Sequence, residues 1–247
     1  MKWMKKVGII GCGAIGTIIS GAVEKGLVEC DELILYDRNT KSAEKIKSSL
    51  HVPIIVVKSL EEMIELKPTV IVEAASQQAV KDYINRILSA NIELIVMSVG
   101  ALLDLNIKSN KIHIPSGAIG GLDSISGAAL AGIDEVILTT RKNPKALDID
   151  NPEEKLVYNG NAEEAVRLFP KEMNVAATLA LTAQPEKVKV RIISDPKVDR
   201  NVHEIKIKWK HGDMLLKFAN DPHPKNPKTS ALAAWSAIKL LTEILNR

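Results

Sequence analysis

Aromatic residues and cysteines are scarce in this sequence. Two Phe, three Tyr and three Trp make up 3% of its 247 residues, so Ile, Val, Leu and Ala must form the core in place of large rings. The two cysteines, Cys12 and Cys30, cannot build a disulfide framework, and their spacing fits no metal-ligand motif. We interpret both as small buried hydrophobic residues and predict no metal site.

Long hydrophobic runs and a strong excess of one charge are also missing. No apolar stretch approaches the roughly 20 residues that span a bilayer, and the basic N-terminus is followed by no recognisable cleavage site. Lys and Arg exceed Asp and Glu by only three and are scattered, whereas a nucleic-acid surface usually shows a clustered basic patch. We therefore expect a cytoplasmic protein that binds neither a membrane nor nucleic acid.

Strand and helix signals alternate through the first half of the sequence. Continuous apolar strands separated by helices are typical of a parallel sheet covered on both faces. The expected strands are 7–11, 32–37, 54–57, 69–75, 93–98 and 111–117, and the expected helices are 14–25, 40–50 and 77–90. We predict a Rossmann-type, doubly wound parallel sheet here.

After residue 117 the pattern changes to runs that alternate apolar and charged residues, which indicates a half-exposed sheet. His211 and Gly212 lie between two such runs and predict a tight hairpin turn. We predict a second α/β domain with a mixed or antiparallel sheet. Its expected strands are 134–142, 155–160, 188–195, 202–209 and 213–221, with helices near 161–169 and 174–183 and a loop at 143–154.

The C-terminal segment has the pattern of an amphipathic helix. Asn226 suits the N-cap and Pro227 the first position of a helix that runs to about Asn246. We expect it to pack back on the first domain through the row Leu232, Trp235, Ile238, Leu241 and Leu245. The expected division is 1–118 plus 224–247 for dinucleotide binding, and 119–223 for substrate, catalysis and dimerisation.

A glycine-rich turn, GCGAIG, joins the first predicted strand to the first predicted helix. Gly11 allows the tight turn, Gly13 allows a pyrophosphate to approach the backbone, and Gly16 allows close helix–strand packing. The helix start at Ala14 and Ile15 offers N–H groups and a positive dipole end to phosphates. A GxGxxG motif alone is weak, but this context favours a dinucleotide site over a glycine-rich turn without a ligand.

Asp37 ends the second predicted strand, 21 residues after Gly16, where an acid accepts hydrogen bonds from the adenosine ribose. Asp37 disfavours a 2′-phosphate, so NAD is favoured, but the adjacent Arg38 could bind that phosphate and keeps NADP as a second acceptable cofactor. The carboxyl ends of later strands should line the rest of the cofactor site. These ends carry Ala75, Ser76, Ser98, Ser116, Gly117 and Ala118.

A nicotinamide domain followed by a mostly β domain suggests a dehydrogenase, with chemistry in a cleft between them and an acid–base group near the nicotinamide. Of the five histidines, His203 is the one expected at a strand end on the inward face of the second sheet, in a row with Ile205, Ile207 and Trp209. Its ordinary pKa suits proton transfer. From the residues alone, a catalytic base and a core histidine are equally good interpretations.

Seven segments together resemble the L-aspartate dehydrogenase family. They are GCGAIG, EAASQQAV (73–80), IPSGAIGGLD (114–123), LTTRK (138–142), FPKEMNVAATLAL (169–181), NVHEI (201–205) and NPKTS (226–230). The resemblance covers nearly the whole chain, and SGAIGGLD and NPKTS are far more specific than GxGxxG. The loops 100–110 and 143–154 match poorly.

The resemblance implies NAD(P)-dependent oxidation of L-aspartate to iminoaspartate, which hydrolyses to oxaloacetate and ammonia or is passed to quinolinate synthesis for NAD production. It also implies a homodimer built from a Rossmann domain and an α/β domain. Carried over by residue, the catalytic histidine falls on His203, and the cofactor contacts fall on the glycine loop, Ala118 and Asn174. Asn174 has an alternative interpretation as a plain helix N-cap, and both can hold.

Aspartate carries two carboxylates, which need cationic or backbone donors. The candidates are Ser116, Gly117, Arg141, Lys142, Asn201, Lys228, Thr229 and Ser230. The alternatives are a solvated strand end for Arg141 and Lys142, and the first turn of a helix for Thr229 and Ser230.

Other activities fit the same architecture less well. Dihydrodipicolinate reductase, an NAD(P)-dependent imine reductase, is expected to carry two adjacent histidines followed by a lysine, which this sequence lacks. Homoserine dehydrogenase is expected to be longer. A non-enzymatic NAD-sensing protein needs a DNA- or partner-binding module, and the sequence shows neither a helix-turn-helix outside the cofactor domain nor a basic stripe.

Overall fold

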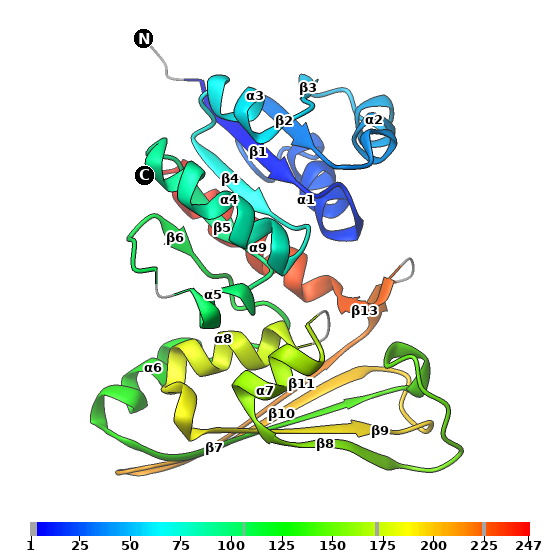
Figure 1. The fold of residues 1–247 in the computed structure, drawn as a ribbon, viewed down its shortest axis with the longest axis vertical. Helices are drawn as coiled ribbons and strands as arrows, with labels where there is room; N and C mark the ends of the chain where they lie inside the picture. Colours follow the sequence, from blue (N-terminus) through cyan, green and yellow to red (C-terminus); the bar gives the residue numbers. More distant parts are fainter. Residues whose placement is uncertain (1–3, 106, 171–172, 224–225) are drawn as a thin grey trace. The chain divides into compact units, whose positions relative to one another are not determined.

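The computed structural model describes residues 4–105, 107–170, 173–223 and 226–247, except for the side chains of 222–223 and 226–229. The chain divides into two units (Figure 1). The first unit contains Met1–Ala101, Leu105–Pro115 and Ala233–Arg247, and the second contains Leu102–Asp104 and Ser116–Leu232. Within the described part of the chain, no helix is long and apolar enough to cross a membrane.

A six-stranded parallel sheet forms the centre of the first unit, which confirms the predicted Rossmann-type architecture. The strands are β1 Lys6–Ile10, β2 Glu32–Tyr36, β3 Ile54–Val56, β4 Val70–Glu73, β5 Glu93–Val96 and β6 Ile112–His113. Their order is β3-β2-β1-β4-β5-β6, and every neighbouring pair is parallel. The chain reverses its direction of winding between β1 and β4, and ligands bind at the carboxyl ends of strands at such a switch point.

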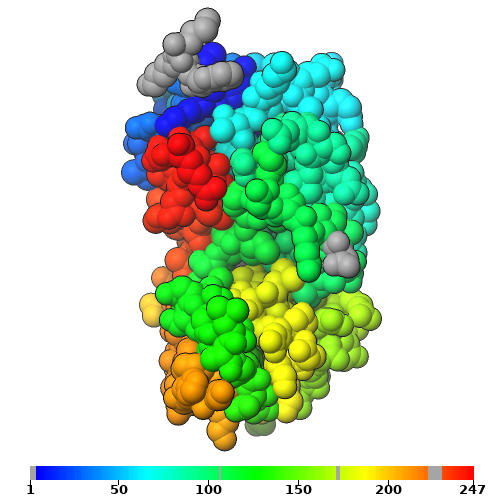
Figure 2. Space-filling model, turned by 90° about the vertical axis from the view of Figure 1, so that its left-hand side faces the viewer, coloured from blue at the N-terminus to red at the C-terminus, as the bar shows by residue number. Residues whose placement is uncertain are grey.

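Helices cover both faces of this sheet. They are α1 Ala14–Glu24, α2 Thr40–Ser49, α3 Leu60–Glu65, α4 Gln77–Ser89 and α9 Ala231–Leu245, while the short helix α5 Ala101–Asp104 follows β5 in the chain. Val7 and Ile9 belong to a core that includes side chains of α1, α2 and α9, whereas Gly8, between them, lies against Met63 of α3. In Figure 2 the C-terminal segment, in red, lies beside the N-terminal segment of the same unit, in blue.

The C-terminal helix packs on the first unit as predicted, but it begins later than predicted. Strand β13, Asn226–Ser230, pairs with β12, Pro222–His223, so the predicted cap at Asn226 and helix start at Pro227 are wrong. Pairing with another strand outweighs the local capping preference here. The hydroxyl of Ser230 instead accepts a hydrogen bond from the backbone N–H of Leu232 at 3.1 Å.

The buried face of α9 differs in part from the predicted row. Leu232 and Trp235 are 37% and 46% exposed, whereas the remaining members of the row, Ile238, Leu241 and Leu245, are buried. Small residues complete the buried face, because Ala234 and Ala237 are fully buried. The predicted row follows the largest side chains, whereas the first turns of the helix are buried through Ala234 and Ala237.

A five-stranded mixed sheet forms the second unit, as predicted. The strands are β7 Ile133–Lys142, β8 Lys155–Asn161, β9 Val188–Ser194, β10 Asn201–Trp209 and β11 Gly212–Asn220. Their order is β11-β10-β7-β9-β8, in which only β7 and β9 pair in parallel. The predicted hairpin turn connects β10 to β11, and Gly212 at this turn has a φ of +154°.

Three helices lie on one face of the second sheet (Figure 1). They are α6 Leu122–Ala131, α7 Ala162–Leu168 and α8 Asn174–Ala183. The sequence pattern predicts α7 and α8 but not α6, because LDSISGAALA is rich in small residues and has a weak apolar periodicity. The predicted loop 143–154 contains one turn of 3-10 helix, Pro144–Ala146.

Candidate active site

The glycine loop connects β1 to α1, and its three glycines meet different neighbours. Gly11 has a φ of +97°, and a side chain there would come within 2.6 Å of the carbonyl oxygen of Ala74. A side chain on Gly16 would come within 2.2 Å of the carbonyl oxygen of Gly11. A side chain on Gly13 would meet no atom within 4 Å. The loop therefore leaves open space at Gly13, beside the N-terminus of α1, where a phosphate can bind.

Asp37, directly after β2, ties the glycine loop to the turn before α2. Its Oδ2 accepts a hydrogen bond from the Cys12 N–H at 2.7 Å, and its Oδ1 accepts one from the Asn39 N–H at 2.8 Å. Each carboxylate oxygen has two lone pairs, so Asp37 can also accept from ribose hydroxyls. Burial and the nearby Asp37 charge raise the pKa of the Cys12 thiol to about 12, which keeps the thiol protonated and unreactive at neutral pH.

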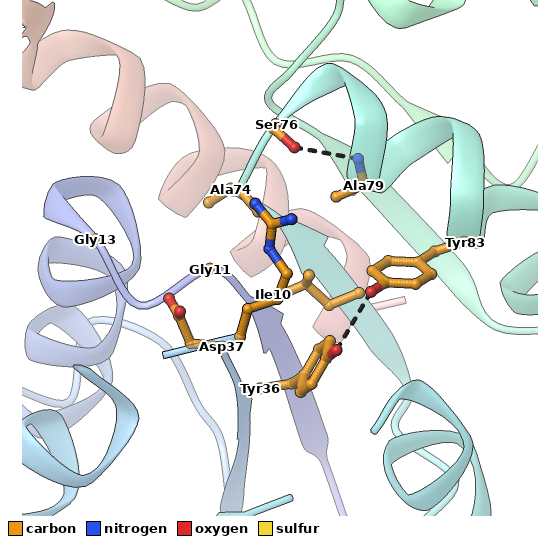
Figure 3. A pocket seen from close by; sticks show the side chains of 11 residues that line it. Ile10, Gly11, Gly13, Tyr36, Asp37, Ala74, Ser76, Ala79 and Tyr83 are labelled. Carbon is orange, nitrogen blue, oxygen red and sulfur yellow. Dashed lines mark hydrogen bonds between the residues drawn. The ribbon is translucent and has the colours of Figure 1, made fainter. Parts of the chain in front are cut away.

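A pocket of about 220 Å³ lies beside Asp37 (Figure 3). The rings of Tyr36 and Tyr83 meet edge to face in its wall, with centroids 6.1 Å apart and hydroxyl oxygens 3.3 Å apart. The guanidinium carbon of Arg86 lies 5.3 Å from the centroid of the Tyr83 ring. The residues that line the pocket are Ile10, Gly11, Gly13, Tyr36, Asp37, Arg38, Ala74, Ala75, Ser76, Ala79 and Tyr83.

The residues predicted at the ends of β4 and β5 take different positions. Both strands end earlier than predicted, at Glu73 and Val96. Ala75 and Ser76 line the pocket, and the Ser76 hydroxyl caps α4 by accepting from the Ala79 N–H at 3.2 Å. Ser98 is absent from the lining and instead donates to the buried carboxylate of Glu73.

In the second unit, His203 is buried at one end of an apolar strand face. It is 3% exposed, and Ile205 and Ile207 on the same face are 0% and 2% exposed, as the alternation predicts. Thr140 lies opposite His203 in the pairing of β7 with β10, and its Oγ1 is 3.0 Å from His203 Nδ1. If Nδ1 carries the proton and donates to Thr140, the basic lone pair lies on Nε2.

The charge state of His203 follows from its surroundings. Burial and the positive charge of Lys142 lower the pKa of His203 to about 3. The imidazole is therefore neutral at physiological pH, but a pKa this low makes it a weak base until an anionic group offsets the charge of Lys142. Lys142 is itself 2% exposed, so the solvated strand end is the wrong interpretation for it. The neighbouring Arg141, on the opposite face of β7, forms an ion pair with Asp195 at 2.7 Å.

Buried polar residues lie at the adjacent ends of three neighbouring strands, beside His203. Lys142 ends β7, and Ser194, which lies opposite it, ends β9. Asn201 starts β10 on the same face as His203. These residues are 0% to 4% exposed, and we call the group formed by Thr140, Lys142, Ser194, Asn201 and His203 the polar strand end. It holds a neutral base and a buried cation, which suits proton transfer on an anionic substrate.

Both units of the chain match known protein families. Residues 123–244 match the family described as aspartate dehydrogenase, C-terminal, and residues 11–112 match homoserine dehydrogenase, NAD binding domain. L-aspartate dehydrogenase from Methanothermobacter thermautotrophicus is 42% identical over 250 residues, which cover 96% of this chain and 95% of that protein. L-aspartate dehydrogenase from Archaeoglobus fulgidus is 40% identical over 248 residues, which cover 96% of this chain and 97% of that protein.

The chain belongs to the L-aspartate dehydrogenase family. The crystal structure of aspartate dehydrogenase from Thermotoga maritima agrees with this, with a TM-score of 0.76, 29% identity, and coverage of 98% of this chain and 97% of that one. Apo scyllo-inositol dehydrogenase from Lactobacillus casei, with a TM-score of 0.58 and 11% identity, shares the fold alone.

Further residues that the family resemblance singled out lie in the second unit. Asn220, opposite Asn201 in the β10–β11 pairing, donates to the carbonyl oxygen of Ala118 at 2.9 Å. This bond fixes the loop that contains Ser116, Gly117 and Ala118 near the polar strand end. Asn174 is the first residue of α8 and the cap position belongs to Met173, so the N-cap interpretation of Asn174 is wrong.

The NPKTS segment of the family resemblance forms β13, so the first turn of a helix is the wrong interpretation for Thr229 and Ser230. Ser230 is 5% exposed. The side chains of Lys228 and Thr229 lie outside the described residues.

Several residues near these sites were not singled out from the sequence. Tyr36 precedes Asp37 directly, and an aromatic residue beside the predicted ribose acid is a usable signal. Tyr83 lies inside α4, and only the tertiary fold brings it to the pocket. Thr140 is one of two adjacent threonines in LTTRK, and choosing between them requires the register of β7 with β10.

Proposed function

We propose that this protein oxidises L-aspartate to iminoaspartate with NAD(P), and that iminoaspartate then hydrolyses to oxaloacetate and ammonia. The observation that carries the proposal is that buried His203 and the positive charge of buried Lys142 lie together in the polar strand end, where that charge lowers the pKa of His203. The identity of the chain to L-aspartate dehydrogenases over nearly its whole length supports the choice of substrate.

The first unit fits a nicotinamide dinucleotide. Gly13 leaves space for a pyrophosphate at the N-terminus of α1, and Asp37 can accept from the adenosine ribose. Asp37 favours NAD, while Arg38 in the same pocket keeps NADP as an acceptable cofactor. The residues proposed to hold the cofactor are Gly11, Gly13, Ala14, Ile15, Gly16, Asp37, Arg38, Ala75, Ser76, Ala118 and Asn174, whereas Ser98 donates to Glu73 and is not proposed to contact the cofactor. The bound nicotinamide supplies the hydride acceptor.

His203 is proposed to move the proton. In its neutral form it can take a proton from the substrate ammonium, or from the water that attacks the imine. Thr140 holds the ring by its contact with Nδ1, and Nε2 is the basic atom in the tautomer in which Nδ1 donates to the Thr140 hydroxyl.

Replacing Thr140 by valine, which keeps the shape but removes the hydroxyl, is expected to lower kcat by about tenfold because His203 loses its buried partner. The KM for aspartate should stay unchanged, since Thr140 acts through His203. Thr140→Ser keeps the hydroxyl and should restore most of kcat. Steady-state kinetics of both variants test this, and a valine variant with full kcat would show that Thr140 does not orient the base.

Lys142 and Asn201 of the polar strand end are proposed to bind the substrate carboxylates. Lys142 is the buried cation there, and a charge-assisted hydrogen bond from it to a carboxylate is strong in a dry site. Asn201 supplies an amide on the same face. The weaker proposals for substrate contact are Ser116, Gly117, Lys228, Thr229 and Ser230.

A panel of amino acids tests both the substrate and Lys142. L-Aspartate should be oxidised far faster than L-alanine or L-asparagine, which lack the second carboxylate. Lys142→Met should raise the KM for aspartate by about 10- to 100-fold and reduce this discrimination. Lys189→Met is the matched control, because Lys189 is an exposed lysine paired with Glu135 on the other side of the sheet. Equal rates with all three amino acids would refute the substrate assignment.

Several finer points stay predictions. They are the homodimer, the cytoplasmic location, the delivery of iminoaspartate to quinolinate synthesis, and the division of the chain into a dinucleotide domain, 1–118 plus 224–247, and a catalytic domain, 119–223.

A further inference from the structure

Glu73 is a buried acidic residue that ends an otherwise apolar strand of the first unit. It is the last residue of β4, in the run VIVE, and only 1% of its surface is exposed. Burying a carboxylate is costly unless several donors replace the lost water. A buried carboxylate at this position therefore indicates a role other than packing in the core.

Four donors surround this carboxylate. Oε1 accepts from the Ala75 N–H at 2.8 Å, the Ser76 N–H at 2.9 Å and the Ser98 hydroxyl at 3.0 Å. Oε2 accepts from the Ser98 N–H at 3.0 Å. The backbone donors belong to the segments that follow β4 and β5, so one side chain ties two neighbouring strand ends together.

The ionised form of Glu73 fits this arrangement. The pKa of Glu73 is raised overall, because burial outweighs the hydrogen bonds from Ser98, Ala75 and Ser76, so the ionised form is supported by the geometry of the donors. Three of the four donors are backbone N–H groups, which cannot accept a proton from a neutral acid. The N-terminus of α4, which begins at Gln77, adds a positive dipole end close to the same segment.

The segment held by Glu73 forms part of the wall of the cofactor pocket. Ala75 and Ser76 line that pocket, and Ser76 also caps α4 through the N–H of Ala79, another lining residue. The same segment lies against the glycine loop, because a side chain on Gly11 would come within 2.8 Å of the Ala75 Cα. A shift of Ala75 and Ser76 would therefore change the space available to a dinucleotide.

We propose that Glu73 is a positioning residue for the cofactor, whose carboxylate holds the Ala75–Ser76 segment in the conformation that a bound dinucleotide requires. The proposal rests on the dinucleotide binding assigned to the first unit above. It does not depend on which amino acid is oxidised. Glu73 acts through the backbone that it holds and makes no contact with the reacting atoms.

The test is Glu73→Gln in the full-length protein, with direct titration of NAD. The amide has the same shape, but its NH₂ group replaces an acceptor and faces an N–H donor. The dissociation constant of NAD is expected to rise by about tenfold or more. The KM for aspartate at saturating NAD should stay near the wild-type value, since the second unit is unaltered.

Two further variants separate positioning from general destabilisation. Ser98→Ala removes one of the four hydrogen bonds and should weaken NAD binding in the same direction by a smaller factor. Glu93→Gln is the matched control, because Glu93 lies at the amino end of β5, away from the carboxyl ends of the strands that carry the cofactor pocket, and pairs with His113 at 2.6 Å. Glu93→Gln should keep the wild-type dissociation constant even where its Tm falls.

The outcomes are distinct. Weaker NAD binding in both the Glu73 and Ser98 variants, with Glu93→Gln unchanged, supports the proposal. Wild-type NAD binding by Glu73→Gln, or equal losses in Glu73→Gln and Glu93→Gln, overturns it. If Glu73→Gln does not fold, the Ser98→Ala titration decides: weaker NAD binding than in Glu93→Gln supports the proposal, and wild-type NAD binding overturns it. A wild-type protein that binds NAD but does not oxidise aspartate would refute the substrate assignment. The test of Glu73 by NAD titration would remain valid.

Discussion

Replacing His203 by asparagine is expected to lower kcat for aspartate oxidation by about 100- to 10,000-fold, because the reaction then lacks its positioned base. The dissociation constant of NAD should remain unchanged, since the dinucleotide phosphates and adenosine are assigned to the first unit. Asparagine is small and polar and can still hydrogen-bond to Thr140, so the sheet should keep its structure. Steady-state kinetics and NAD titration measure the two quantities separately.

His211→Asn is the matched control for this prediction. His211 lies at the exposed hairpin turn, where its ring packs edge to face on Trp209 with centroids 5.3 Å apart. The control should keep the wild-type kcat. If the His203 variant also keeps most of its activity, then His203 is a core histidine, and the base must be sought elsewhere.

Replacing Asp37 by serine is expected to change the cofactor preference of the protein. The ratio of kcat/KM with NAD to that with NADP should fall by about 100-fold, because the carboxylate no longer binds the ribose and no longer repels a 2′-phosphate. Arg38, which lines the same pocket, can then pair with that phosphate. Measuring kcat/KM for both cofactors in the wild type and the variant checks this.

Asp37→Asn separates the role of Asp37 in cofactor recognition from its role in holding the glycine loop. The amide keeps one oxygen that can accept from the Cys12 or Asn39 N–H, but it has lost the negative charge. It should therefore shift the preference toward NADP with little loss of stability. An equal loss with both cofactors in the serine variant would contradict the prediction and would limit Asp37 to tying the glycine loop to the turn before α2.

The sheet of the first unit could be predicted because its signals are local. Continuous Ile and Val runs, each followed by a helical pattern, indicate buried parallel strands without knowledge of their partners. The glycine loop and Asp37 are equally local, because their spacing along the chain follows from one strand–turn–helix unit. His203 also follows from alternation along a single strand.

The errors arise where pairing with another segment decides the structure. The local capping pattern favours a start of α9 at Pro227, yet residues 226–230 pair with β12, which directly precedes them in the chain. The partner of His203, Thr140, depends on the register of two strands 63 residues apart in sequence. Glu73 lies inside the predicted strand 69–75 without a distinguishing signal, and its role depends on Ser98, 25 residues further along the chain.

The most direct test of the proposed reaction uses L-aspartate deuterated at Cα with NAD and the purified protein. Mass spectrometry should find one deuterium in the NADH formed, in an amount equal to the ammonia released, because the hydride comes from Cα. Deuterium-free NADH would contradict the proposed hydride transfer. No turnover of aspartate, together with turnover of another amino acid or of a cyclic imine, would contradict the proposed function itself.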